Sequence, residues 1–282
     1  MNAVLITGAS RGIGEATARA LVERGYDVYA GVRRVTDAPA GTRPVQLDVT
    51  DEASIASAVE DIAALLGGSG LQALINNAGI IVQGPLELTP ADELRQQFEV
   101  NVIGPAAVMR ACVPLLRQGN GRIVNISAPT ARVAMPFLGP LSASKAALES
   151  LSHAARVELA PWRIPVVLVV PGAMDTQIFT RAGERAEATF DAAPSGQRAL
   201  YEPALAALEA TLAKAKPNDV GVAVKAIVRA VESRKPKTRY VAGRDARSAA
   251  MLTHVPTRTR DRLLISYLGL RKVPRSAADA TS

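Results

Sequence analysis

Along the first 242 residues, short β-branched runs alternate with longer helical patterns, and this alternation limits the fold more than any other feature. Strands that alternate with helices form βαβ units, in which a crossover helix joins two parallel strands. We therefore predict one α/β domain with a doubly wound, seven-stranded parallel sheet flanked by helices. The predicted strands are Ala3–Thr7, Asp27–Val32, Pro44–Leu47, Ala73–Asn76, Arg122–Ile126, Val166–Val170 and Arg239–Ala242. The predicted helices are Gly12–Arg24, Glu52–Leu66, Pro90–Leu116, Leu141–Leu159 and Val220–Ser233.

Length and composition are consistent with one large domain and a basic extension. The chain has 282 residues, of which 48% are hydrophobic and 21% charged, as in ordinary folded proteins. We assign residues 1–250 to the domain and residues 251–282 to the extension. A polar segment at about 176–217 separates the last two predicted strands. Long inserts in compact domains are usually lids or binding loops, so we predict an irregular lid there.

Charge is unevenly distributed along the chain. The net charge is +7, and from Lys225 to the end there are 14 Lys or Arg against 4 Asp or Glu. This surplus leaves the first 224 residues at −3. A basic end of this kind suits a solvated surface or an acidic partner. The amphipathic patch Arg262–Leu268 can dock on its own subunit, on a partner subunit or on a membrane surface, and the first is favoured.

Simple counts argue against several classes of protein and site. No run of about 18 apolar residues is present, so we predict no membrane span. The chain begins without a signal-peptide pattern, and its single cysteine, Cys112, suits a reducing compartment, which predicts a cytoplasmic protein. The sequence has no zinc-ligand spacing, so we predict no metal site. It also lacks an aromatic-interleaved basic patch, so we predict no nucleic-acid binding.

The first predicted strand leads directly into a glycine-rich run, Thr7-Gly8-Ala9-Ser10-Arg11-Gly12-Ile13-Gly14. Glycines at such a turn let the backbone bend sharply and approach a pyrophosphate, which rests on the free amides of the following helix. A position between a strand and a helix is the context in which this motif binds a dinucleotide. The predicted contacts are Gly8, Ser10, Arg11, Gly12, Ile13 and Gly14.

The end of the second strand indicates which dinucleotide is bound. An acidic residue at this point would bind the ribose 2′-hydroxyl of NAD. Here the strand ends in Val32 and is followed by Arg33 and Arg34, while Arg11 lies in the glycine loop. Guanidinium groups suit a 2′-phosphate instead, because they form charge-assisted hydrogen bonds with it. We therefore predict NADP(H), with Arg33 as a contact.

Further motifs resemble the short-chain dehydrogenase/reductase family. They are Asp48-Val49 after the third strand, Asn76-Asn77-Ala78-Gly79 after the fourth, Asn101, Lys145, and Pro171-Gly172 with Thr176 beyond it. The resemblance extends to about Gly243, and the long insert and extended end look most like the hydroxysteroid and retinol dehydrogenase branch. It implies a Rossmann fold, a homodimer or homotetramer built on two long helices, and hydride transfer between NADP(H) and a hydrophobic carbonyl or alcohol.

The same resemblance implies roles for individual residues. Asp48 and Val49 would contact the adenine, and the loop of Pro171, Gly172 and Thr176 would contact the nicotinamide amide. The remaining cofactor contacts implied are Asn77, Ala78, Gly79 and Lys145.

The family's chemistry uses four side chains, of which two are present. Lys145 would lower the pKa of a catalytic tyrosine and bind the nicotinamide ribose, and Asn101 would hold a proton-relay water. The tyrosine position, four residues before Lys145, is Leu141, and the position of the substrate-orienting serine is Ala128. Both groups that touch the substrate oxygen are therefore missing, while those for cofactor and water are kept.

Nearby polar groups are poor replacements. Ser142 is rotated by about 100° on the helix from position 141, and strand alternation turns Ser127 away from the face of position 128. Thr130 lies in a loop that can swing inward. We expect His153 and His254 to be surface or interface residues, while Tyr201 and Tyr267 would reach a pocket only if it closed.

Three hypotheses stay open at this point. The protein is a reductase with weak or atypical redox activity, a non-redox enzyme such as a cyclase or isomerase that retains NADP structurally, or a non-catalytic NADP-binding partner protein. The family resemblance favours the first. The sequence does not identify the substrate, although an apolar pocket under a lid suggests a bulky hydrophobic molecule.

Overall fold

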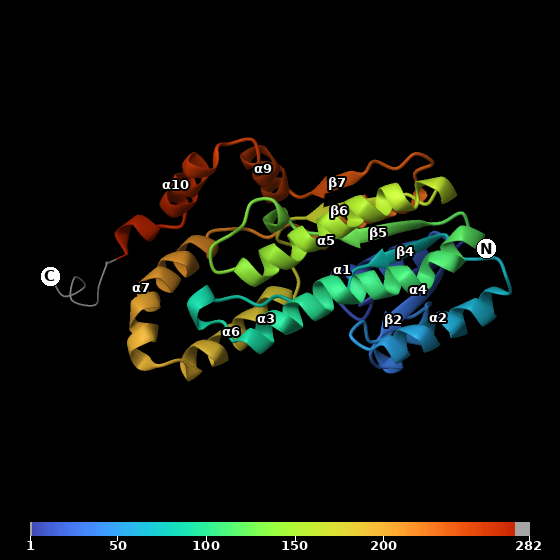
Figure 1. Ribbon diagram of the computed structural model, residues 1–282, viewed down its shortest axis with the longest axis horizontal. Coiled ribbons are helices and arrows are strands. Elements are labelled where there is room, and N and C mark those ends of the chain that lie inside the picture. Colours follow the sequence, from blue (N-terminus) through green and yellow to red (C-terminus); the bar gives the residue numbers. More distant parts are fainter. Residues whose placement is uncertain (1, 274–282) are drawn as a thin grey trace.

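The computed structural model describes residues 2–273 and contains a seven-stranded sheet in the order β3-β2-β1-β4-β5-β6-β7 (Figure 1). All paired strands are parallel. The chain changes its direction of winding between β1 and β4, and ligands of such sheets bind in the crevice at the carboxyl ends of the strands there. The strands are β1 (Ala3–Thr7), β2 (Asp27–Val32), β3 (Arg43–Gln46), β4 (Ala73–Asn76), β5 (Arg122–Ile126), β6 (Val166–Pro171) and β7 (Arg239–Ala242). The seven predicted strands are confirmed, with each end within one residue.

Helices cover both faces of the sheet. One face carries α1 (Gly12–Val22) and α8 (Val220–Glu232), and the other carries α2 (Glu52–Leu66), α4 (Gly104–Gln118) and α5 (Gly139–Glu158). Successive strand residues point to opposite faces, so each face has its own core. In β1, Ile6 belongs to the core under α1 and α8, and Leu5 belongs to the other. Short 3₁₀ turns are η1 (Val35–Asp37), η2 (Leu86–Leu88), η4 (Pro129–Ala131), η5 (Ala160–Trp162) and η6 (Leu270–Lys272).

The predicted helix Pro90–Leu116 is divided in the structure. It consists of α3 (Ala91–Phe98), a π-helical turn η3 (Glu99–Ile103) and α4. A π turn inserts an extra residue into a helix and often marks a functional site. The whole stretch Ala91–Gln118 is long and apolar enough to cross a membrane, but half of its most apolar window is buried in the protein. Burial of this kind is what a core helix requires.

The segment predicted as an irregular lid is helical, so that part of the prediction is wrong. It contains α6 (Ile178–Ala192) and α7 (Ser195–Leu212). Both helices are rich in alanine, which has the highest helix propensity, and Pro194 stands at the N-cap of α7.

The C-terminal helices return to the body of the protein. α9 (Arg244–Leu252) crosses the predicted boundary at residue 250, and α10 (Thr257–Tyr267) follows it. Beyond α10, Leu268 is fully buried, and a Cβ built on Gly269 would lie 3.6 Å from the Cβ of Ala207 in α7. Self-docking of the amphipathic patch is therefore seen only at its end: Leu268 is buried, whereas Leu263, Ile265 and Tyr267 are exposed. Figure 1 shows α6, α7 and α10 beyond one end of the sheet. Residues 274–282 of the predicted extension lie outside the described residues.

Candidate cofactor and active site

Backbone packing shapes the glycine loop between β1 and α1. Gly8 and Gly12 have φ angles of +65° and +56°, which residues with side chains rarely adopt. A Cβ on Gly14 would overlap the Gly8 carbonyl oxygen and the side-chain amide of Asn77. Arg11, at the N-cap of α1, makes no side-chain cap, so the first N–H groups of the helix are available to an anion. The loop therefore fits a pyrophosphate.

Asn77 ties this loop to the end of β4. Its Nδ2 donates hydrogen bonds to the carbonyl oxygens of Thr7 and Gly8 at 3.1 and 3.0 Å. Thr7 Oγ1 in turn accepts from the backbone N–H groups of Asn77 and Ala78, both at 3.1 Å. A Cβ on Gly8 would lie 2.8 Å from Ala78 Cα. These contacts fix the carboxyl ends of β1 and β4 against each other at the crevice.

The segment after β6 reaches the glycine loop from the other side. A Cβ built on Gly12 would lie 3.3 Å from Thr176 Cγ2. Gly172 N donates to the Ala242 carbonyl at 2.8 Å, and a side chain at Gly172 would overlap the carboxylate of Asp245. Pro171 is the last residue of β6. The structure therefore brings Thr176 to the dinucleotide loop, while its contact with a nicotinamide stays a prediction.

Asp48 and Val49 lie between β3 and α2, next to the start of α4. Asp48 Oδ1 accepts hydrogen bonds from Thr50 N at 3.0 Å and from Thr50 Oγ1 at 2.7 Å. The Val49 carbonyl oxygen would lie 2.7 Å from a Cβ on Gly104. The loop is thus fixed in place, and its role in binding adenine stays a prediction.

Of the two arginines after β2, only one is engaged. Arg34 donates from Nε and Nη2 to the carboxylate of Asp37 at 3.0 and 3.2 Å. The side chain of Arg33 is exposed and makes no hydrogen bond or ion pair within residues 2–273, and the same holds for the side chain of Arg11 in the glycine loop. These two guanidinium groups are therefore available to a ligand phosphate.

Lys145 and Asn101 bring their polar groups to the same place. Lys145 Nζ donates to the Ile126 carbonyl at the end of β5, at 2.7 Å. A Cβ on Gly79 would lie 3.3 Å from Asn101 Oδ1 and 3.8 Å from Lys145 Nζ, so both groups reach the turn after β4. Burial lowers the pKa of Lys145 from 10.5 to about 8. The ammonium group of Lys145 is thus a stronger acid than that of an exposed lysine.

Asn101 acts together with Gln97, which the sequence analysis did not identify. Asn101 Oδ1 accepts from Ile80 N at 2.9 Å, and its Nδ2 donates to the Ile80 carbonyl at 3.0 Å. Gln97 Oε1 accepts from Val82 N at 2.7 Å, and its Nε2 also donates to Ile80 O, at 3.0 Å. The spacing of the two amides, four residues apart in the predicted helix Pro90–Leu116, was the signal that could have found this pair.

Leu141 and Ala128 present apolar surface where the family has hydroxyls. Leu141 lies one turn before Lys145 on α5 and is 6% exposed. It packs with Ile81, with Leu138 and with Ala182 of α6, so α6 rests on it. Ala128 is the N-cap of η4. Neither side chain can donate a proton, and together they leave an apolar wall beside a polar, buried lysine.

Comparison with known proteins decides the family. Residues 2–187 match the model of the family described as short chain dehydrogenase. The chain belongs to this family. It is 31% identical to an NADPH-dependent 3-dehydrocapnine reductase of Ornithobacterium rhinotracheale, over 98% of this chain and 100% of that protein. It is also 31% identical to a 3-amino-tetrahydro-pyrrolizinone reductase of Xenorhabdus hominickii, over 91% and 92% of the two chains. A short chain dehydrogenase from Burkholderia cenocepacia, solved in complex with NADP, matches with a TM-score of 0.74 and 30% identity, covering 94% of this chain and 97% of that one.

Glu149 lies on the same helix as Lys145 and holds several elements together near the candidate site. Its carboxylate accepts hydrogen bonds from Ser127 Oγ at 2.7 Å, from Arg132 Nε at 3.1 Å and from Arg239. Burial alone would raise the pKa of Glu149, but its bonds to Arg239, Ser127 and Arg132 lower it below the usual value. The cluster joins α5, β5, β7 and the turn after η4. In the sequence, Glu149 could have been found by its position four residues after Lys145, because residues at this spacing share a helix face.

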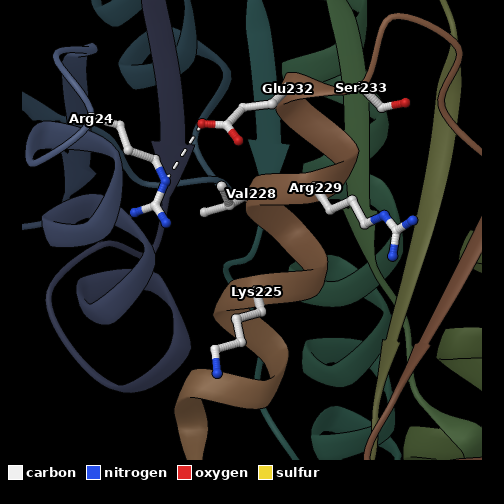
Figure 2. Close-up of a pocket in the computed structure, with 6 residues that line it drawn as sticks. All are labelled: Arg24, Lys225, Val228, Arg229, Glu232 and Ser233. Carbon is white, nitrogen blue, oxygen red and sulfur yellow. Dashed lines mark ion pairs between the residues drawn. The ribbon is translucent and has the colours of Figure 1, made fainter.

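A surface hollow lies away from this site. It has a volume of about 450 Å³ and lies between the C-terminal ends of α1 and α8, at the amino edge of the sheet (Figure 2). Arg24 and Glu232 form an ion pair across it at 3.5 Å, and Figure 2 shows Arg229 pointing away from Lys225 and Arg24. Because its cations do not converge, the hollow does not resemble an anion site.

Proposed function

We propose that this short-chain dehydrogenase binds NADP(H) and acts on a bulky hydrophobic carbonyl or alcohol with weak redox activity. One observation carries the proposal: on α5, Lys145 keeps its buried position and its bond to Ile126 O, while Leu141 one turn earlier is packed among apolar side chains. The cofactor groups are kept and the proton-delivering hydroxyl is absent. The two relatives with full-length similarity are both reductases, which supports reduction as the direction of the reaction.

The residues of the dinucleotide loop fit NADP(H). The glycine loop and the free amides of α1 would hold the pyrophosphate, and Arg11 and Arg33 would hold the 2′-phosphate. Lys145 would bind the nicotinamide ribose. When bound, NADPH supplies the hydride for reduction of a carbonyl carbon.

The reaction then needs a proton at the substrate oxygen, and the chain supplies it poorly. Leu141 and Ala128 have no proton to give. The nearest acid described above is the Lys145 ammonium, with a pKa of about 8. It already donates to Ile126 O, so delivery to a substrate depends on another of its N–H bonds or on water. Losing a well-placed general acid costs roughly 10²- to 10⁴-fold in rate, which is why we expect slow turnover.

The test is consumption of NADPH, followed by its absorbance, with reactive bulky ketones. We expect turnover well below about 1 per second. The rate should fall as the pH rises through about 8, because Lys145 is protonated below its pKa and loses the transferable proton above it. An ordinary rate with no dependence on pH in this range would contradict the proposal. Product formation without an absorbance change would favour the non-redox enzyme. Absence of any turnover, together with NADP-dependent partner binding, would favour the non-catalytic protein.

We also propose a homodimer or homotetramer that uses α4 and α5. Most apolar residues between Asn101 and Leu116 do not serve an interface, because Val102, Val108, Met109 and Leu116 are buried in the chain itself. Three exposed apolar side chains support the proposal instead: Ile103, just before α4, and Leu151 and Val157 on α5. A monomer in light scattering at micromolar concentration would contradict it. A small hydrophobic substrate, a cytoplasmic location and an acidic partner for the basic end remain further proposals.

A further inference from the structure

The turn and helix between residues 127 and 145 carry four hydroxyl side chains near the missing catalytic groups. Three of them are bonded inside the protein: Ser127 to the Glu149 carboxylate at 2.7 Å, Ser142 to the Leu138 carbonyl at 2.8 Å, and Ser144 to the Leu141 carbonyl at 2.9 Å. The fourth differs. Thr130 Oγ1 is buried and has no hydrogen-bond partner among residues 2–273.

A buried hydroxyl without a partner is unfavourable, because it has lost its bonds to water and gained none in return. Such a group in a folded protein calls for an explanation, and a bound ligand is one. The chain contains a useful comparison: Thr17 Oγ1 is also buried and unpaired, but Thr17 lies within α1 and faces the core. What distinguishes Thr130 from Thr17 is therefore its position in the fold.

Thr130 lies in η4, two residues after Ala128 and four after Ile126. The Ile126 carbonyl binds Lys145, so this turn begins at the lysine that marks the site. η4 packs against α5, the helix that carries both Leu141 and Lys145. The turn also follows the carboxyl end of β5, which is the edge where ligands of such sheets bind.

We propose that the Thr130 hydroxyl binds the carbonyl oxygen of the substrate in place of the hydroxyls missing at positions 128 and 141. The inference deepens the proposed function and rests on it. The substrate would have one acceptor oxygen, held by Thr130, and an apolar body packed against the wall formed by Ile81, Leu141 and Ala182. Thr130 would orient the oxygen without supplying the proton. It would therefore strengthen substrate binding, while turnover would stay slow.

The test compares binding of a bulky ketone with binding of its hydrocarbon. The probes are 2-decalone and decalin, titrated by calorimetry into the NADPH-saturated protein. Thr130→Val keeps the shape of the side chain and removes the hydroxyl, and Thr130→Ser keeps the hydroxyl. Thr17→Val removes the other unpaired hydroxyl and serves as the matched control.

We expect Thr130→Val to weaken 2-decalone binding about three- to tenfold, the loss of one hydrogen bond, with decalin and NADPH affinities unchanged. Thr130→Ser and Thr17→Val should keep the preference for the ketone. Both valine variants should raise the melting temperature of the free protein by about 2–4 °C, because each removes an unsatisfied buried group. Because both valine variants share this rise, it reports only the removal of an unsatisfied buried hydroxyl. A loss of ketone binding seen in Thr130→Val alone then reports the ligand contact.

Equal binding of 2-decalone by Thr130→Val and the parent would overturn the assignment of Thr130 and leave the proposed function standing. If the parent protein binds neither 2-decalone nor decalin, the proposed function is contradicted, and the role of Thr130 is contradicted with it. If Thr130→Val does not fold, loss of the ketone preference in Thr130→Ala, with NADPH affinity kept, gives the same answer.

Discussion

The two halves of the catalytic crevice differ in what holds their groups in place. On the cofactor side, a Cβ at Gly8 or Gly14 would overlap neighbouring atoms, and the side-chain amide of Asn77 is bonded to the Gly8 carbonyl. On the substrate side, Leu141 packs into an apolar cluster and Ala128 only begins a short turn. The cofactor side is part of the fold, because changing it would separate β1 from β4. The substrate side is a set of side chains on a fold that is complete without them.

This contrast explains how both catalytic hydroxyls can be absent from an intact scaffold. Removing one of two facing polar groups leaves its partner unsatisfied, whereas removing both leaves an apolar surface at little cost. Leu141 also gains a contact with Ala182 on the lid helix, which tyrosine would have to displace. The folded protein therefore does not need these hydroxyls for its stability. Their absence should be detected only in a reaction rate or a binding constant.

The largest expected effect comes from restoring the substrate side. The double variant Leu141→Tyr with Ala128→Ser should increase NADPH-dependent reduction of bulky ketones by about 10²- to 10⁴-fold over the parent, measured by NADPH absorbance. Each single change should do much less, because the proton donor and the group that orients the oxygen act as a unit. Leu141→Tyr alone should recover more than Ala128→Ser alone, since the phenol supplies the proton.

The matched control for this variant is Leu141→Phe with Ala128→Ser. Phenylalanine brings the bulk of tyrosine against Ala182 without a proton to donate. An equal gain from the phenylalanine variant would mean that reshaping the pocket, and not proton delivery, limits the parent. The contrast between the two halves of the crevice would then be wrong.

The sequence predicted the fold well because its signals are local. All seven strands follow from β-branched runs, and the glycine loop follows from the strand and helix on either side of it. The π turn at Glu99–Ile103 was missed because it depends on contacts of Gln97 and Asn101 with Ile80 and Val82, which are distant in sequence. The helical lid was misread because its polar residues were given more weight than its alanines.

Prediction of the site reached the residues with a fixed spacing and stopped there. Lys145 and Asn101 follow from the family motif, and the structure places them together at Gly79. Glu149 has no family motif, and Thr130 was named only as a loop residue that can swing inward. Whether such a side chain is buried, and which partners it has, cannot be read from a sequence.

The smaller expected effect concerns the cofactor side. Arg33→Ala should weaken NADPH binding by about 1–3 kcal/mol and leave NADH binding nearly unchanged, because a charge-assisted bond to the 2′-phosphate is lost. The measurement is a fluorescence titration of each cofactor into parent and variant. Arg33 is suited to this role because its guanidinium has no partner among residues 2–273.

Arg34→Ala is the matched control, since the two arginines are adjacent and both exposed. Arg34 is already paired with Asp37 at 3.0 Å, so its removal takes away one positive charge at the same end of β2 without removing a free phosphate ligand. We expect it to weaken NADPH binding much less than Arg33→Ala does. Equal losses from both variants would mean that general positive charge, and not a specific contact, selects the phosphate. The 2′-phosphate would then have no dedicated side chain on the cofactor side. The two halves of the site would then differ less in how firmly their groups are fixed.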